Sequence, residues 1–306
     1  MENNEVNVSI PVIDMQKFPD PEEYKKLREA CEKWGTFRIV NHLIPSTLMA
    51  EMKRAVRSLL DLPFEIKKRN TEVIPGSGYK APNAVNPLYE ALGLYDMGSL
   101  QAVQTFCSQL NATPHQREVI EMYGKAIYKL AVDLGQKISE SLGLAGDFFK
   151  DWPCQFRINK YNFTPESVGT LGVQTHTDSS FLTILQEDEN VGGLEVMEKS
   201  SGAYIPVQPS SGTLLVNLGD VATVWSNGRF YNVKHRVQCK EATIRVSIAT
   251  FLLGPKEGVL ETPLELVDSD HPRLYVPFTY EELRKLRLSK NLHAGEALEQ
   301  LVRIHS

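Results

Sequence analysis

The sequence lacks the features that mark membrane proteins and nucleic-acid-binding proteins. It has no apolar run near the roughly 18 to 20 residues that a membrane helix requires. Its first residues, MENNEVNVS, are polar where a signal peptide would carry a basic and then an apolar stretch. The 33 Lys and Arg residues face 38 Asp and Glu residues, which gives a formal net charge of -5 and no basic block. We therefore expect a cytoplasmic protein that binds neither a membrane nor nucleic acid.

Cysteines are few, and their spacing excludes two further classes. Cys31, Cys107, Cys154 and Cys239 lie far apart and form no C-x-x-C pair. Neither a zinc ribbon nor a disulfide framework is indicated, and we expect buried, reduced thiols. The chain also has no internal repeats and no low-complexity tracts. With 306 residues it is long enough to form the large core of an enzyme.

Hydrophobic spacing predicts helices in the first half of the chain. Apolar residues recur at helical spacing over 21–35, and a second amphipathic helix follows Pro45. From 72 to 99, Gly, Pro and Asn interrupt any regular period, which predicts an irregular loop. Thr113 and Pro114 then open the clearest helix, a long spine that ends before Gly143.

The second half has the pattern of a β core. From Phe156 to Leu253, short strands alternate with turn signals at Gly192 and Gly193, at the SSG around Ser211, and at the hairpin-type pair Asn227 and Gly228. Many short strands at even spacing predict a sandwich or a barrel. A helical tail is expected over 280–304. The expected regions are an N-terminal helical and β region (1–112), the spine helix (113–150), the β core (151–256) and a C-terminal helical segment (257–306).

The stretch QTHTDSSFLTIL contains two metal-ligand side chains in a β-branched run. In a strand, His176 and Asp178 point to the same side. His235, which follows the Asn227 turn, supplies a third ligand, and two His with one carboxylate are typical of non-haem Fe(II) oxygenases. A structural zinc that also uses Cys239 is an alternative, and so are satisfied polar groups with no ligand role.

Two further strands place polar residues on one face. In RVSIATFLL, Arg245 and Ser247 share a face, where a guanidinium beside a hydroxyl suits a ligand carboxylate. The alternative is that Arg245 pairs with one of the many Glu residues. In FRINKYNF, Arg157, Asn159 and Tyr161 also share a face, and a polar stripe in a core indicates a bound polar ligand.

Taken together, these motifs resemble the Fe(II) and 2-oxoglutarate dependent dioxygenases of plants. The resemblance rests on HTD at 176–178, the later His235, R-x-S at 245–247 and N-x-Y at 159–161. The stretches IPVIDM, WGTFRIVNHLIP and SNGRFYNVKHRV extend it over nearly the whole chain. One departure is Leu43, where the family usually has Gly, and it concerns a local turn rather than the chemistry.

The resemblance implies a mixed α and β fold, with a double-stranded β-helix (distorted jelly roll) core and flanking helices. It implies Fe(II), 2-oxoglutarate and dioxygen as cofactor and co-substrates, with ascorbate as reductant. The residues it assigns are His176, Asp178 and His235 to the metal, and Arg245, Ser247, Tyr161 and Asn159 to 2-oxoglutarate.

Within that family, three strings are most similar to the auxin-oxidising dioxygenases: GSGYKAPNAVNPLYEALGLYDM, DWPCQFRINKYNF and VGGLEVMEKSSG. This likeness implies oxidation of indole-3-acetic acid, or of its amino-acid conjugates, to the 2-oxindole form. We expect Arg157 to bind the carboxylate of this small aromatic acid and Phe251 to pack on the indole. The alternatives are a surface ion pair for Arg157 and core packing alone for Phe251. Tyr79 is a candidate for a lid.

Three alternatives remain open from the sequence. The first is a related dioxygenase that acts on a gibberellin, a flavonoid or an alkaloid. The second is an oxidase of the same superfamily that does not consume 2-oxoglutarate. The third is a non-catalytic jelly roll that binds a small molecule and uses the His residues only structurally.

Overall fold

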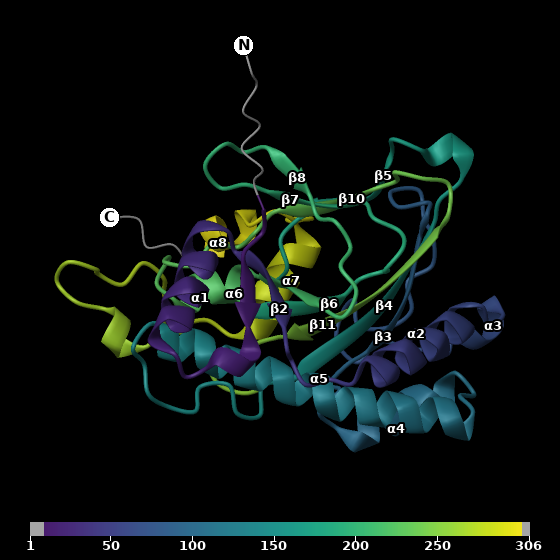
Figure 1. The fold of residues 1–306 in the computed structure, drawn as a ribbon, viewed down its shortest axis with the longest axis horizontal. Helices are drawn as coiled ribbons and strands as arrows, with labels where there is room; N and C mark the ends of the chain where they lie inside the picture. The colour runs from purple at the N-terminus through teal and green to yellow at the C-terminus, as the bar shows by residue number, and fades with distance from the viewer. Residues whose placement is uncertain (1–8, 302–306) are drawn as a thin grey trace, which may run out of the picture.

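Two β-sheets face each other in the computed structural model, which describes residues 9–301 (Figure 1). Most of the polar N-terminal stretch and the last part of the expected tail, 302–304, lie outside this range. The seven-stranded major sheet has the order β1 (Val12–Asp14), β2 (Thr36–Val40), β9 (Leu214–Leu218), β6 (Leu182–Gln186), β11 (Ile244–Leu252), β4 (Cys154–Asn162) and β3 (Tyr89–Leu94). The four-stranded minor sheet has the order β5 (Leu171–His176), β10 (His235–Gln238), β7 (Leu194–Met197) and β8 (Tyr204–Pro206). This arrangement confirms the jelly-roll core.

Helices cover the outer face of the major sheet. They are α1 (Pro21–Lys33), α2 (Ser46–Leu60), α4 (Leu100–Gln109) and α5 (Pro114–Ser141), and α5 runs beneath β6 and β11 (Figure 1). The spine helix begins as predicted, because Thr113 and Gln116 form a capping box and Pro114 takes the first helical position. Shorter elements are α3 (Phe64–Lys67) and the 3-10 turns η1 (Met15–Lys17), η2 (Pro165–Ser167) and η3 (Leu264–Leu266). Within residues 9–301, no helix is both long and apolar enough to span a membrane.

The alternation of β4 separates the helix-side core from the space between the sheets. Phe156 and Ile158 are fully buried on the helix side, and the odd-numbered residues face the minor sheet. β11 is antiparallel to β4 in a register that pairs Arg245 with Tyr161 and Ser247 with Asn159. The two polar rows predicted from the sequence therefore lie side by side.

Three local predictions are wrong. The irregular loop expected over 72–99 contains β3, which pairs with β4. The region expected to hold only strands contains α6 (Asp220–Trp225), and Asn227 and Gly228 end that helix instead of joining two strands. Both residues have positive φ, as a hairpin turn would need, but the same conformation also terminates helices: the Gly228 N–H donates to the Thr223 carbonyl at 2.8 Å.

The C-terminal tail is helical, as expected, but it is divided. It forms α7 (Tyr280–Ser289) and α8 (Glu296–Leu301), with positive φ at Asn291 and Gly295 between them. The unusual Leu43 adopts φ 63°, the left-handed conformation that a Gly would enter without strain. Its side chain is 82% exposed, so the turn survives the substitution at a cost of about 1 kcal/mol.

Candidate active site

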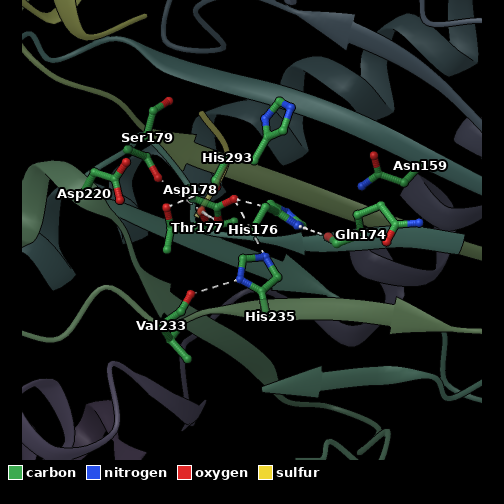
Figure 2. A network of polar contacts seen from close by, with 12 residues as sticks. Asn159, Gln174, His176, Thr177, Asp178, Ser179, Asp220, Val233, His235 and His293 are labelled. Atoms are coloured by element: carbon green, nitrogen blue, oxygen red, sulfur yellow. Dashed lines mark hydrogen bonds and ion pairs between the residues drawn. The ribbon is translucent and has the colours of Figure 1, made fainter. Parts of the chain in front are cut away.

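The three predicted metal ligands come together at the ends of two neighbouring strands. His176 ends β5, and the register of the minor sheet places it opposite His235, the first residue of β10. Asp178 follows β5 and turns toward both rings (Figure 2). One ligand atom from each residue lies within 4.8 Å of the other two. The Asp178 Oδ1 atom is 3.7 Å from His176 Nε2 and 3.8 Å from His235 Nε2.

Hydrogen bonds on the far sides of these groups fix which atoms face the centre. His176 Nδ1 donates to the Gln174 carbonyl at 2.8 Å, and His235 Nδ1 donates to the Val233 carbonyl at 3.2 Å (Figure 2). Each ring therefore turns its Nε2 lone pair inward. Thr183 donates to Asp178 Oδ2 at 2.5 Å, which leaves Oδ1 directed at the imidazoles.

The charges of the cluster suit a divalent cation. Burial and the neighbouring His235 lower the pKa of His176 to about 4, so this ring is neutral at physiological pH. Burial would raise the pKa of Asp178, but the two imidazoles and Thr183 hold it below its usual value. Imidazole nitrogens with one carboxylate, and no thiolate, fit Fe(II) with open coordination positions.

The zinc alternative does not gain a fourth ligand from Cys239. Its thiol lies 3.4 Å from the Ser167 hydroxyl and 3.4 Å from the Glu241 carbonyl, away from the cluster. Within the described part of the chain, the group with metal-ligand geometry contains only the two His residues and Asp178. All four cysteines are buried free thiols, as expected.

An inner cavity of about 180 Å³ lies between the sheets, beside the metal cluster, and Arg245 lines it. Arg245 is 2% exposed; its Nη1 donates to the Ser247 hydroxyl at 3.3 Å, and its guanidinium lies 5.1 Å from the centre of the Tyr161 ring. Its Nε has no partner, and Arg245 makes no ion pair within residues 9–301. The nearby Glu187 pairs with Arg38 at 2.6 Å instead. A buried, unpaired guanidinium calls for an anionic ligand.

The other two predicted co-substrate residues also line the inner cavity. Burial raises the pKa of Tyr161, so its hydroxyl stays protonated and can donate a hydrogen bond. Asn159 accepts a hydrogen bond from the Tyr89 hydroxyl at 2.8 Å, which orients its amide.

A larger outer cavity of about 770 Å³ leads from the metal cluster toward solvent. Arg157 and Phe251 line both cavities, so they mark the passage between them. The Arg157 guanidinium donates to the Gly76 carbonyl and forms no close ion pair in the described part of the chain, although its charge helps to lower the pKa of Glu72.

Tyr79 is the one candidate that the structure does not bring to the site. Its hydroxyl donates to Glu90 at 2.5 Å, and it lines neither cavity. Glu90 lies on the face of β3 opposite to Tyr89, whose side chain does line both cavities. The aromatic residue of this segment that faces the site is therefore Tyr89.

Sequence reasoning missed three residues that shape the site. Tyr89 lay in a segment without strand periodicity, and Thr183 belongs to the same motif as His176 but carried no ligand signal. Arg287 of α7 donates to the Thr177 carbonyl at 2.7 Å and to the Asp220 carboxylate. No sequence signal joins the tail to the HTD motif, because the contact spans 110 residues.

Comparisons with known proteins agree with this geometry. Residues 152–254 match the family model of the 2OG-Fe(II) oxygenase superfamily, and residues 10–101 match the N-terminal model of the non-haem dioxygenase in morphine synthesis. The chain is 53% identical over 297 residues to the 2-oxoglutarate-dependent dioxygenase DAO of Oryza sativa subsp. indica, covering 96% of this chain and 99% of that protein.

Two solved structures are similar along most of the chain. The crystal structure of the dioxygenase for auxin oxidation in rice has a TM-score of 0.90 and 52% identity. The match covers 96% of this chain and 100% of that chain. The dioxygenase for auxin oxidation 1 from Arabidopsis thaliana, in complex with 2-oxoglutarate, has a TM-score of 0.84 and 61% identity, and the match covers 87% of this chain and 100% of the other.

Proposed function

The chain belongs to the 2OG-Fe(II) oxygenase superfamily, and from that premise we propose that it oxidises the auxin indole-3-acetic acid, or its amino-acid conjugates, to the 2-oxindole form. It is a 2-oxoglutarate-dependent dioxygenase that uses Fe(II). The reaction inactivates the hormone. The observation that carries the choice of substrate is the outer cavity, which is lined by the Arg157 guanidinium, the Phe251 ring and two of the metal ligands.

We assign roles to the residues as follows. His176, Asp178 and His235 would hold Fe(II), and their Nδ1 and Oδ2 hydrogen bonds keep the ligand atoms directed inward. When bound, Fe(II) and 2-oxoglutarate supply the oxidising chemistry, in which dioxygen is consumed and 2-oxoglutarate becomes succinate and carbon dioxide. Arg245 and Ser247 bind the distal carboxylate of 2-oxoglutarate, Tyr161 donates a further hydrogen bond, and Asn159 positions that end of the cavity.

The protein's own contribution in the outer cavity is placement of the substrate. Arg157 binds the carboxylate of the aromatic acid by charge and hydrogen bonding, and Phe251 packs against the ring. One polar anchor and one apolar wall select an aromatic acid over a neutral ring. The similarity to auxin-oxidising dioxygenases disfavours a gibberellin, a flavonoid or an alkaloid as the main substrate.

A competition experiment tests the proposal. The enzyme is incubated with Fe(II), ascorbate, 2-oxoglutarate and a mixture of indole-3-acetic acid, its amino-acid conjugates, a gibberellin and a flavonoid, and mass spectrometry identifies which acid gains oxygen. We expect an indole acid to gain one oxygen only when 2-oxoglutarate is present. The control is the Asp178→Ala variant, which lacks one metal ligand and which we expect to fold but to show no turnover.

Each alternative has its own signature in this experiment. If the gibberellin or the flavonoid is oxidised and the indole acids are not, the protein acts on that other substrate class. Turnover without 2-oxoglutarate would indicate an oxidase, and the absence of both succinate and product would indicate a binding protein. A cytoplasmic location is part of the proposal, and cell fractionation tests it.

A further inference from the structure

Gln155 carries a buried polar atom that no residue in the described part of the chain satisfies. It lies on β4, two residues before Arg157 on the same strand face, and its side chain lines the outer cavity. The residue is 5% exposed, and its Oε1 atom is buried without a hydrogen-bond partner. Its side chain makes no hydrogen bond within residues 9–301. A buried acceptor left unpaired costs about 1 to 3 kcal/mol, which a bound ligand with a donor group would offset.

The neighbours of Gln155 indicate the kind of ligand. In the register of β4 and β11, Gln155 stands directly opposite Phe251, so the two side chains lie next to each other on the cavity face. Arg157 is about 6.6 Å further along the strand, at two rises of about 3.3 Å. A flat ring that packs on Phe251 therefore meets an amide acceptor at one point of its edge and a cation at another.

We propose that Gln155 is a specificity-determining residue, which accepts a hydrogen bond from the ring N–H of an indole acid packed on Phe251. This inference rests on the proposed function, and it adds the feature that separates an indole from other fused aromatic rings. In indole-3-acetic acid the N–H occupies ring position 1 and the acid is attached at position 3. The Gln155 and Arg157 contacts therefore bracket position 2, the carbon oxidised in the 2-oxindole form.

A second amide competes for this role. Asn86 lines both cavities, and its Oδ1 is also buried without a partner. It belongs to a loop between Asn83 and β3, whereas Gln155 lies on strand β4 and is paired with Phe251 of β11. The strand position adjacent to the aromatic wall favours Gln155 as the acceptor, because groups on strands are placed more precisely than groups on loops.

The test compares two ligands that differ at one ring atom. Indole-3-acetic acid has a ring N–H, and benzothiophene-3-acetic acid has a sulfur in its place. Binding to the holoenzyme with Fe(II) and 2-oxoglutarate is measured by calorimetry without oxygen, so that no turnover occurs. We expect the unmodified protein to prefer the indole by about tenfold or more. Gln155→Leu should bind the two ligands equally and, with oxygen admitted, oxidise the indole at more than one ring position.

Matched variants separate the possible outcomes. Gln186 also has a buried, unpaired Oε1 but lines neither cavity, so Gln186→Leu should keep the preference for the indole. If Asn86→Leu loses the preference and Gln155→Leu keeps it, Asn86 is the acceptor and the proposal is overturned. Gln155→Met, which has a similar length, replaces the Leu variant if that one fails to fold.

Ligand binding by the unmodified protein shows whether this inference or the proposed function fails. Equal binding of the two ligands by the unmodified protein would overturn the role of Gln155 while leaving auxin oxidation intact. If the unmodified protein binds neither ligand and no amino-acid conjugate of indole-3-acetic acid, the proposed function itself is overturned.

Discussion

Arg245 is the residue whose environment explains most about the inner cavity. It is a fully buried cation, and its Nε has no partner. We predict that Arg245→Ala raises the 2-oxoglutarate concentration needed for half-maximal rate by about 30-fold or more, since removing one partner of a buried charge pair costs about 2 to 5 kcal/mol. Steady-state kinetics with each substrate varied in turn checks this, and the requirement for auxin should change little.

Ser247→Ala is the matched control for that prediction. It removes a neutral hydroxyl 3.3 Å from the same guanidinium, so its effect on 2-oxoglutarate should be smaller, about five- to tenfold. A loss confined to auxin in the Arg245 variant would mean that the assignments of the two cavities are exchanged.

Arg157 is expected to recognise the acid group of the substrate. We predict that Arg157→Leu weakens binding of indole-3-acetic acid far more than binding of 3-methylindole, which has no acid, and leaves the 2-oxoglutarate requirement unchanged. Calorimetric titration with both indoles measures the difference. If both indoles were weakened equally, the anchor would have to be sought at Lys80, which also lines the outer cavity but pairs with Glu72 at 2.8 Å.

For single residues, the sequence predicted side chains that strand alternation places on one face. It missed side chains whose position depends on how distant segments pack. Arg245 and Ser247 are two residues apart within β11, and a strand puts such pairs on one face. His176 and Asp178 have the same spacing, but β5 ends at His176, so strand alternation alone does not place Asp178. Tyr79 and Tyr89 could not be told apart, because both lie in a segment rich in Gly, Pro and Asn. Only the formation of β3 decides which ring faces the cavity.

Among the elements, α7 contacts the site through an ion pair and through hydrogen bonds from Arg287 to Thr177. Arg287 donates to the carboxylate of Asp220, which is completely buried. We predict that Arg287→Leu lowers the free energy of unfolding by about 3 to 5 kcal/mol at neutral pH, because it leaves the buried Asp220 charge unpaired. Lys285→Leu on the same helix removes an exposed pair with Glu281 and should change stability by less than about 1 kcal/mol.

The same variant should show a characteristic pH dependence. Burial raises the pKa of Asp220 and Arg287 opposes this, so the pKa rises further when Arg287 is removed. A carboxyl whose pKa is raised by folding costs no stability below its pKa in the unfolded chain, about 4. The cost grows as the pH rises from there through its pKa in the folded protein. The loss in free energy of unfolding caused by Arg287→Leu should therefore become smaller as the pH falls toward about 4. Urea unfolding at several pH values measures it, and a deficit independent of pH would contradict the role of Asp220.

Elements with strong local signals were predictable, and elements set by distant partners were not. The spine helix has its cap, its first-turn proline and a long apolar stripe within its own sequence. β3 forms because β4 offers an unpaired edge, and nothing in the segment 72–99 shows that edge. α6 is a short apolar run, for which helix and strand cannot be distinguished by period alone.

Across the whole molecule, the chemistry depends on two sheets that contribute different groups. The major sheet supplies the guanidinium of Arg245 and the polar row of β4, which is Arg157, Asn159 and Tyr161. The minor sheet supplies both imidazoles. The N-terminal segment completes the major sheet with β1, β2 and β3. The jelly roll and the metal ligands could be predicted through the resemblance of motifs, but the way the two cavities meet at Arg157 and Phe251 required the structure.

The central claim is that this protein couples the oxidation of an indole acid to the decarboxylation of 2-oxoglutarate. The most direct test is a reaction under ¹⁸O₂ in which succinate and oxidised indole acid are both quantified by mass spectrometry. We predict one succinate for each oxidised indole-3-acetic acid, with one labelled oxygen atom in each product. Oxidised product without an equal amount of succinate, or succinate whose formation does not depend on the indole acid, would contradict the account.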